Sequence, residues 1–261
     1  MSIRYPYISI TDFTSPKQVY KMLSVFRKNS RSGREIHYKL GVGVMMSYKT
    51  LNSLPTKWST IFPPKERVSE IFVSDSHSTD YWLFNTLHYA DYKSIDVLNN
   101  LLKATEFGGK NMHALQLDMI WPEPEILQEY QEIYPNIQII LQASSVALDQ
   151  EDNDPEKLVD RLLSYQETVD YVLLDKSMGR GLGMDAQALE PFVKVINSRT
   201  ALEVVVAGGL GPNTLNLLGP LPHYIVSIDA QSRLRPSGNA LDPIDWAMAG
   251  EYLCKALTIL S

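Results

Sequence analysis

The chain of 261 residues contains one cysteine, Cys254, so no intrachain disulfide can form. Such scarcity is typical of proteins from a reducing compartment. Leu253, Ala256 and Leu257 share a helical face with Cys254, and we therefore interpret the thiol as a packing residue.

Long apolar runs are absent from the sequence. It has no stretch of about 18 apolar residues, the minimum for a membrane-spanning helix. Its first residues lack the apolar segment of a signal peptide. We therefore expect a cytoplasmic protein without a membrane partner.

Positive charge is also in short supply. The 24 Lys and Arg residues are outnumbered by 30 Asp and Glu residues, which gives a net charge of −6. This balance argues against a nucleic acid partner, while a local site for one small phosphate remains compatible with it. With 44% hydrophobic and 21% charged residues, the composition is that of an ordinary globular protein.

Apolar segments alternate with segments of helical periodicity along the whole chain. Strands are predicted over Tyr7–Ile10, Tyr38–Met46, Leu83–Ala90, Ala114–Ile120, Ile137–Ala143, Val172–Leu174, Leu202–Ala207 and Tyr224–Ile228. Helices are predicted from Pro16 onward and over Lys65–Phe72, Ile95–Glu106, Pro124–Ile133, Pro155–Tyr165, Ala186–Ser198, Thr214–Leu218 and Pro243–Leu260. Eight alternating units in this length predict a parallel sheet closed into a single (β/α)8 TIM barrel, with one domain over residues 1–261.

The connection from Ser47 to Asp80 follows this pattern least well. Pro55, Pro63 and Pro64 interrupt it, and only one short helix is predicted within it. A connection of this length in a compact domain is either functional or partly ordered.

Asp175 lies at the carboxyl end of the sixth predicted strand, where Gly179, Gly181 and Gly183 follow. Glycines between a strand and a helix could bind a dinucleotide, but this spacing is not the dinucleotide fingerprint. The next strand, Leu202–Ala207, also lacks the terminal acid that would hold a ribose. We therefore expect no dinucleotide, and no other cofactor.

Active sites of such barrels lie at the carboxyl ends of the strands. There the predicted strands deliver polar side chains that we expect around one mouth: Ser9, Thr11, Asp12, Ser47, Lys49, His88, Asp118, Gln142, Asp175, Lys176 and Asp229.

Gly208 and Gly209 follow the seventh strand, and Gln231 and Ser232 follow the eighth. Backbone amides exposed by glycines at a strand end can bind a phosphate, and the loops after strands seven and eight often form that site in this fold. The alternative is that these glycines only make tight turns. Further candidates for contact with a phosphorylated substrate are Gly181, Gly183, Lys49, Gln142 and Asp229.

Residues 170–185, 207–213 and 227–232 resemble, in order and spacing, the last three strand ends of phosphoribosylanthranilate isomerase, a barrel enzyme of tryptophan synthesis. Tyr7–Thr11 looks like the first strand of that family. The resemblance implies an Amadori rearrangement, in which a phosphorylated aminoaldose becomes an aminoketose. A general acid opens the sugar ring and a general base takes the proton from C2, and the resemblance implies that Asp175 is the acid.

The chain departs from that family at the general base. The family has a cysteine at the end of its first strand, where this chain has Ser9, and a hydroxyl is a weak base without an activating partner. The family's arginine for the anthranilate carboxylate has no evident counterpart, and Lys49 is the nearest cation. Asp12, Asp118 and His88 are candidates for the base, because carboxylates in one dry pocket acquire separate pKa values.

Several alternatives remain open from sequence. His88, Asp118, Asp175 and Asp229 could surround a metal, but they lack a closely spaced ligand pair, and we rank this below a metal-free site. Trp121 could form an aromatic wall for a planar substrate, or pack. The protein could instead be a phosphosugar epimerase or lyase, or a barrel that binds a phosphorylated ligand without catalysis, and it could form a homo-oligomer.

Overall fold

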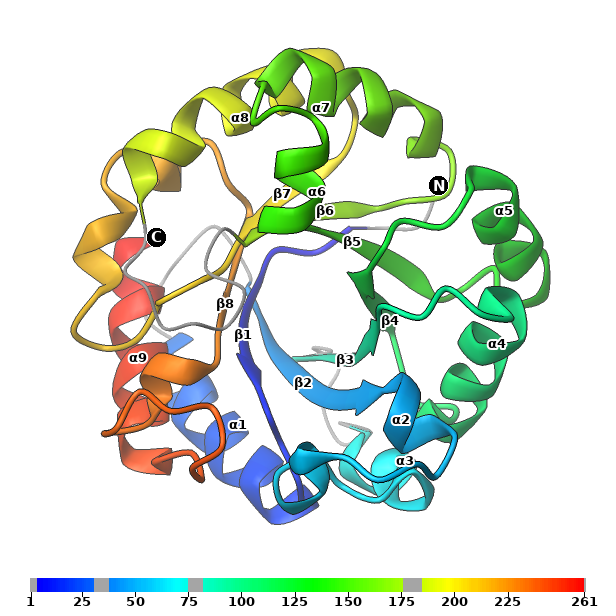
Figure 1. Cartoon of the computed structure of the whole chain (residues 1–261). Helices are drawn as coiled ribbons and strands as arrows, with labels where there is room; N and C mark the ends of the chain where they lie inside the picture. Colours follow the sequence, from blue (N-terminus) through cyan, green and yellow to red (C-terminus); the bar gives the residue numbers. More distant parts are fainter. Residues whose placement is uncertain (1–3, 31–37, 75–81, 176–184, 261) are drawn as a thin grey trace.

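The predicted apolar segments form the strands of a closed barrel in the computed structural model, which describes residues 4–30, 38–74, 82–175 and 185–260 (Figure 1). The strands are β1 (Tyr7–Thr11), β2 (Lys39–Ser47), β3 (Leu83–Asp91), β4 (Ala114–Met119), β5 (Gln138–Ser144), β6 (Tyr171–Asp175), β7 (Glu203–Val206) and β8 (Ser227–Ala230). Each strand pairs in parallel with the next, and β1 pairs with β8 to close the ring. The predicted (β/α)8 TIM barrel is confirmed.

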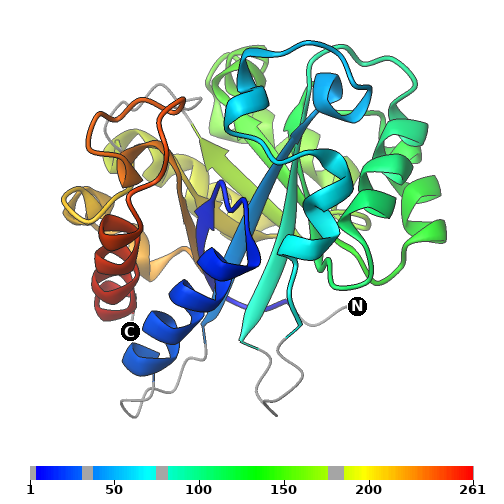
Figure 2. The same cartoon turned by 90° about the horizontal axis from the view of Figure 1, so that it is seen from below.

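Helices surround the strands on the outside of this ring (Figures 1 and 2). The longer ones are α1 (Pro16–Ser30), α4 (Val97–Gly108), α5 (Pro124–Ile133), α7 (Pro155–Leu162), α8 (Ala186–Arg199) and α9 (Trp246–Ile259). The short ones are α2 (Tyr48–Leu51), α3 (Val68–Ile71) and α6 (Ser145–Gln150). Among the described residues, none of these helices has the length and apolar character needed to cross a membrane.

Several predictions about the bounds and types of elements were wrong in detail. The last strand begins at Ser227 instead of Tyr224, because residues 221–223 form a 3-10 turn. The helix expected after β7 is reduced to a 3-10 turn at Leu215–Leu218. The final helix begins at Trp246, where the side chain of Asp245 caps it.

The connection between β2 and β3 has more structure than the sequence suggested. It contains α2, a 3-10 turn at Lys57–Thr60, a second turn at Lys65–Arg67 and then α3. These pieces are too short to show a periodic pattern. Part of this connection lies beside the open upper end of the barrel in Figure 2.

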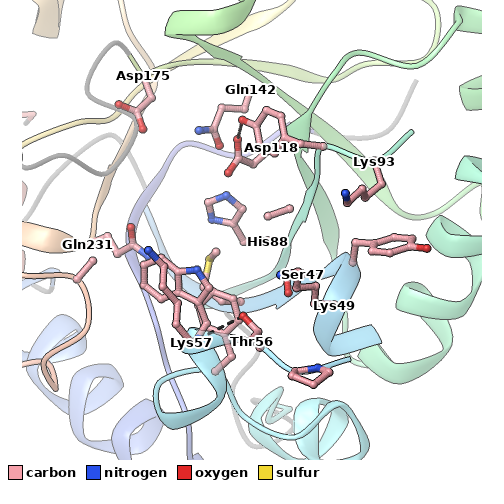
Figure 3. Close-up of a pocket in the computed structure, with 18 residues that line it drawn as sticks. Ser47, Lys49, Thr56, Lys57, His88, Lys93, Asp118, Gln142, Asp175 and Gln231 are labelled. Atoms are coloured by element: carbon pink, nitrogen blue, oxygen red, sulfur yellow. Dashed lines mark hydrogen bonds between the residues drawn. The ribbon is translucent and has the colours of Figure 1, made fainter. Parts of the chain in front are cut away.

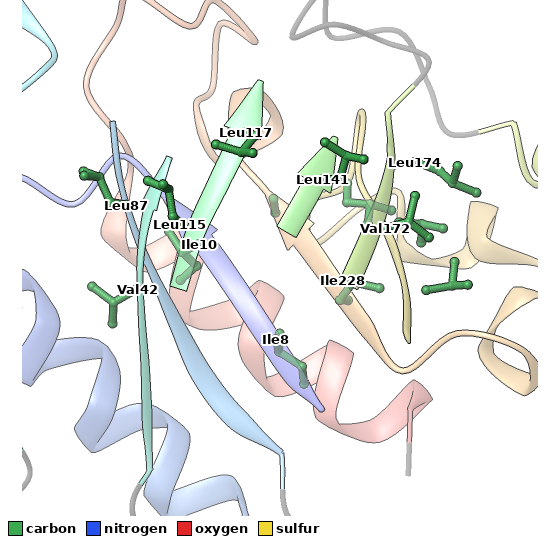
Figure 4. Close-up of a cluster of buried hydrophobic side chains, with 14 of the residues drawn as sticks. Ile8, Ile10, Val42, Leu87, Leu115, Leu117, Leu141, Val172, Leu174 and Ile228 are labelled. Carbon is green, nitrogen blue, oxygen red and sulfur yellow. The ribbon is translucent and has the colours of Figure 1, made fainter. Parts of the chain in front are cut away.

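Side chains alternate between the two faces of every strand, as the period of two requires. The outward set packs beneath the helices and includes Ile8, Ile10, Val42, Leu87, Leu115, Leu117, Leu141, Val172, Leu174 and Ile228 (Figure 4). The inward set forms a separate apolar cluster of Tyr7, Phe84, Ala114, Ile140, Tyr171, Leu173, Val205 and Ala207.

Further along the same strands, the interior becomes polar. Ser9 and Thr11 follow Tyr7 at intervals of two on β1, and His88 lies four residues after Phe84 on β3. All three polar side chains are buried. The carboxyl half of the barrel therefore presents hydrogen-bonding groups where the amino half presents rings.

Two glycines let β2 approach β1 closely. A Cβ atom on Gly41 would lie 2.5 Å from the Cβ of Ser9, and one on Gly43 would lie 2.5 Å from Oγ1 of Thr11. A side chain at either position would push on a residue of β1. The glycines therefore set the position of the first strand.

Gly41→Ala should lower the free energy of unfolding by about 1–3 kcal/mol, because an overpacked position displaces its neighbours. Gly250→Ala in α9 is the matched control, since its nearest heavy atom would lie 3.8 Å away. That control should be neutral or stabilise by about 0.5–1 kcal/mol, the helical advantage of alanine over glycine. Chemical denaturation measures both changes. Equal midpoints for the two variants would show that the strands can separate without cost.

Candidate active site

Two adjoining cavities lie at the carboxyl ends of the strands. The larger has a volume of about 970 Å³ and the smaller about 30 Å³. Both are lined by His88, Gln142, Asp175 and Gln231, from β3, β5, β6 and the residue after β8. Figure 3 shows these four side chains around one opening. The predicted convergence of polar groups on one mouth is therefore present in the fold.

The larger cavity has a wall of aromatic and lysine side chains. They come from the connection after β2 and from the residues that follow β3, and they are Tyr48, Lys49, Lys57, Trp58, Phe62, Tyr92 and Lys93. The Trp58 and Phe62 rings stack with centroids 5.4 Å apart, and the Lys57 ammonium lies 5.2 Å from the centre of the Trp58 ring. This wall suits a planar group that carries negative charge.

Of this wall, the sequence indicated only Lys49 as a substrate-binding residue. Lys57 and Trp58 lie in the connection that the sequence pattern left unassigned, and only the fold brings them to the cavity. Tyr92 and Lys93 offered a weak signal, because they directly follow the third strand.

The smaller cavity is built around the turn after β7. Gly208 and Gly209 line it with φ angles of 97° and 68°, in the left-handed region that favours glycine. Ser232, after β8, lines the same cavity. Within the described chain, we find no protein acceptor for the backbone amides of Gly208 and Gly209, so these amides are available to an anion.

Asp229 lies on β8 and lines the smaller cavity. The hydroxyl of Thr11 lies 3.0 Å from each of its carboxylate oxygens. Burial raises the pKa of Asp229 to about 7, although the nearby hydroxyls of Ser9 and Thr11 oppose the shift. The negative charges of Asp175 and Asp12 add to the increase in this pKa. A carboxyl group poised near neutral pH is suited to proton transfer.

Ser9 and Asp12 line neither cavity. Ser9 is buried and lies opposite Asp229 in the register of β1 and β8. Asp12 accepts a hydrogen bond of 2.5 Å from the guanidinium of Arg235, a side chain with no exposed surface. Its φ angle of 88° is unusual for a residue with a side chain.

The ion pair of Asp12 holds the loop after β8. Besides Asp12, Arg235 donates hydrogen bonds to the backbone carbonyls of Gln231, at 2.7 Å, and Asp242, at 2.5 Å. Gln231 and its neighbour Ser232 line the smaller cavity. Burial raises the pKa of Asp12, and the positive charge of Arg235 opposes that increase. Asp12 therefore has a structural role, because its ion pair with Arg235 holds the loop that lines the candidate phosphate site.

His88 belongs to a buried chain of amides. The amide nitrogen of Gln116 lies 3.2 Å from Nε2 of His88 and donates to the side-chain carbonyl of Gln142 at 2.9 Å. Burial lowers the pKa of His88 to about 4. The imidazole is therefore neutral at pH 7 and hydrogen-bonds as an uncharged ring.

Asp118 lines the larger cavity and receives a hydrogen bond of 2.5 Å from the hydroxyl of Tyr92. Burial raises the pKa of Asp118, and the Tyr92 hydroxyl opposes that increase. The carboxyl group is thus held by the rim of the cavity.

The remaining candidates from the sequence either lie outside the described residues or do not line the site. Gly181, Gly183 and Lys176 lie outside the described residues. Trp121 lines neither cavity and donates to the backbone carbonyl of Gln142 at 2.8 Å, so its ring packs and forms no wall of the site. No cluster of three potential metal ligands occurs within the described ranges.

No family model and no curated protein sequence matches this chain. Function is therefore inferred from the geometry of the site, together with the resemblance at the strand ends.

Replacing His88 should change how stability depends on pH. Between pH 6.5 and 4 the unfolded chain binds a proton at His88 that the folded protein does not bind. The free energy of unfolding therefore decreases as the pH falls through this range. Because one pKa unit corresponds to about 1.4 kcal/mol, that loss amounts to about 3 kcal/mol.

The measurement is chemical denaturation of the wild type and His88→Gln at several pH values. The wild-type free energy of unfolding minus that of the variant should fall by about 3 kcal/mol from pH 6.5 to 4. Burial also lowers the pKa of His113 to about 4, but His113 is present in both proteins and cancels in this difference. A difference independent of pH would contradict the neutral, buried state of His88.

Proposed function

We propose that this protein is an isomerase that converts a phosphorylated aminoaldose into an aminoketose by general acid and base catalysis. The observation that carries the proposal is that Asp175 and Asp229 line one cavity together with the Gly208–Gly209 turn. Proton transfer needs a pair of groups whose environments differ, and a phosphate needs backbone donors. The candidate site offers both within one small space.

The phosphate half of the substrate is assigned to the amides of Gly208 and Gly209 beside Ser232. The smaller cavity, at about 30 Å³, has room for about one water molecule. A phosphate would therefore place an oxygen at the glycine turn and extend into the adjoining larger cavity. The sugar would then lie next to Asp175, which lines both cavities.

Asp175 is assigned the general acid, as the resemblance implies. It ends β6 and is 9% exposed, so the barrel holds it firmly while one side faces the cavities. Placement at the tip of a rigid strand favours a fixed geometry for proton transfer.

The second half of the substrate is assigned to the larger cavity. Its volume of about 970 Å³ exceeds the needs of a phosphorylated pentose, and Lys49, Lys57 and Lys93 line it. Cations beside Trp58 favour an aromatic group with a carboxylate, the kind of amine that the resemblance implies.

A barrel that binds the phosphorylated ligand without catalysis is the second candidate function. Ser9 favours it, because a buried serine stands where the family has its base. This candidate shares the phosphate site with the first. The two differ in turnover, which the next experiment measures.

Asp175→Asn should lower turnover by about 100-fold or more, the usual contribution of one acid–base group. The assay is NMR detection of the ketose formed from N-(5-phosphoribosyl)anthranilate. Asp160→Asn, on the exposed surface of α7, is the matched control and should keep wild-type turnover. Full activity in Asp175→Asn would remove its assignment as the acid. Absence of turnover in the wild type, with phosphate binding intact, would favour the non-catalytic barrel.

Gly209→Asp should weaken the binding of inorganic phosphate at least tenfold, because it places a side chain and a negative charge at the turn. Gly238→Asp is the matched control, since Gly238 has the same φ angle of 68° and lines neither cavity. Both variants carry the same backbone strain, so the difference between them reports on the site. Isothermal titration calorimetry gives the two dissociation constants. Equal affinities would place the phosphate elsewhere.

A further inference from the structure

We infer that Asp229 is the general base of this site and that Thr11 is its positioning residue. The inference rests on the proposed isomerase function and names the group that the replacement of cysteine by Ser9 leaves unassigned.

The position of Asp229 supports this role. Its strand, β8, lies between β7, which precedes the Gly208–Gly209 turn, and β1, which carries Thr11. Its carboxylate borders the same cavity as Asp175 and the glycine turn. A substrate anchored by its phosphate at this turn would therefore begin beside Asp229 and continue past Asp175, which lines both cavities.

Thr11 fixes the orientation of the Asp229 carboxylate. Its hydroxyl lies 3.0 Å from both oxygens, and Ser9 lies opposite Asp229 in the register of β1 and β8. A hydrogen bond to a carboxylate stabilises the charged form, which is the form that accepts a proton. Ser9, which stands where the family has its cysteine, is thus a neighbour of the proposed base.

The other candidates for the base are committed elsewhere. Asp12 pairs with Arg235, and Asp118 accepts from Tyr92 at the rim of the larger cavity. His88 binds its proton only near pH 4, too low for an efficient base at neutral pH.

The charges around Asp229 are arranged to keep its carboxyl group ready to exchange a proton. Groups from the surrounding elements that interact electrostatically with Asp229 or line its cavity are Asp175, Asp12, Tyr7, Tyr252, His88 and, through Asp12, Arg235. The main electrostatic influences on Asp229 are the two other carboxylates, which disfavour a second negative charge. The only guanidinium in this group, that of Arg235, is held by Asp12.

The proton transfers balance over the reaction. Asp175 gives a proton to the ring oxygen as the C1–O bond breaks and the nitrogen lone pair forms a C1=N bond. Asp229 then takes the C2 proton; the C–H electron pair forms C1=C2, and the C=N pair returns to nitrogen. The enolamine becomes the aminoketose when a proton leaves the C2 hydroxyl and another adds to C1. The proton on Asp229 returns to Asp175 through solvent.

The test follows turnover and the exchange of the C2 proton in D2O by NMR, with N-(5-phosphoribosyl)anthranilate as the probe. In the wild type, kcat/KM should rise with pH through a limb near pH 7, because the base acts in its ionised form and kcat/KM reports the pKa of the free protein. Asp229→Asn should lower both turnover and exchange about 100-fold or more. Inorganic phosphate should still bind to this variant, which shows that the fold and the phosphate site persist.

Thr11 variants separate positioning from folding. Thr11→Val removes a hydrogen bond to the ionised carboxylate, so the limb in kcat/KM should move to higher pH, and Thr11→Ser should return it toward the wild-type position. An unchanged limb in Thr11→Val would overturn the positioning role. Thermal melting of each variant confirms that it is folded.

The outcomes distinguish this inference from the proposed function. Exchange that persists in Asp229→Asn, or a limb near pH 7 that is lost in folded Asp12→Asn but kept in Asp229→Asn, overturns the base and leaves the isomerase standing. Exchange without formation of ketose in the wild type supports the base and overturns the isomerase. Absence of both exchange and ketose in the wild type overturns both.

Discussion

The pairing of the first strand with the last is the interaction on which the candidate site depends. Ser9 lies opposite Asp229 in the register of β1 and β8, and Thr11 bonds to both oxygens of the same carboxylate. Near the other end of this seam, the backbone amide of Tyr7 donates to the hydroxyl of Ser227 at 2.9 Å. The contacts that close the barrel between β1 and β8 therefore also orient the carboxylate of the proposed base.

Burial of so many polar groups inside a barrel is costly unless they bond to one another. Gln116 meets this condition by joining His88 to Gln142, and Arg235 meets it with Asp12 and two backbone carbonyls. Asp229 is different, because its hydrogen-bonding partner is the neutral hydroxyl of Thr11, and the carboxylates of Asp175 and Asp12 raise its pKa further. A buried carboxyl group of that kind is the one whose protonation responds near neutral pH.

The two halves of the barrel interior differ in their side chains, with apolar packing in the amino half and the candidate site in the carboxyl half. The rings of Tyr7 and Phe84 stack with centroids 4.8 Å apart in the amino half, where Tyr171 also packs. Hydrogen-bonding side chains replace the rings toward the carboxyl ends. Burial of polar side chains at the mouth of the barrel is unfavourable. The apolar packing in the amino half and beneath the helices stabilises the folded protein enough to offset this cost.

Local sequence determined most of the strands and the identity of the residues at their ends. Apolar runs of strand length and the alternation with helical patterns predict a barrel, and carboxyl ends of parallel strands must meet at one face. The positions of Asp175, Asp229, His88 and Gln142 along their strands were therefore enough to assign all four to one mouth. The glycines after β7 were recognisable for the same reason, since only their backbone geometry is needed to mark a turn.

Tertiary structure alone decided which of these residues contact one another. The ion pair between Asp12 and Arg235 joins positions far apart in the chain, and no periodic pattern encodes it. Lys57 and Trp58 reach the cavity because a connection of short turns folds beside the barrel mouth. The protonation of Asp229 likewise depends on burial and on charges from other strands. Periodicity reports the face on which a residue lies, whereas partners, burial and pKa arise from the packing of distant segments.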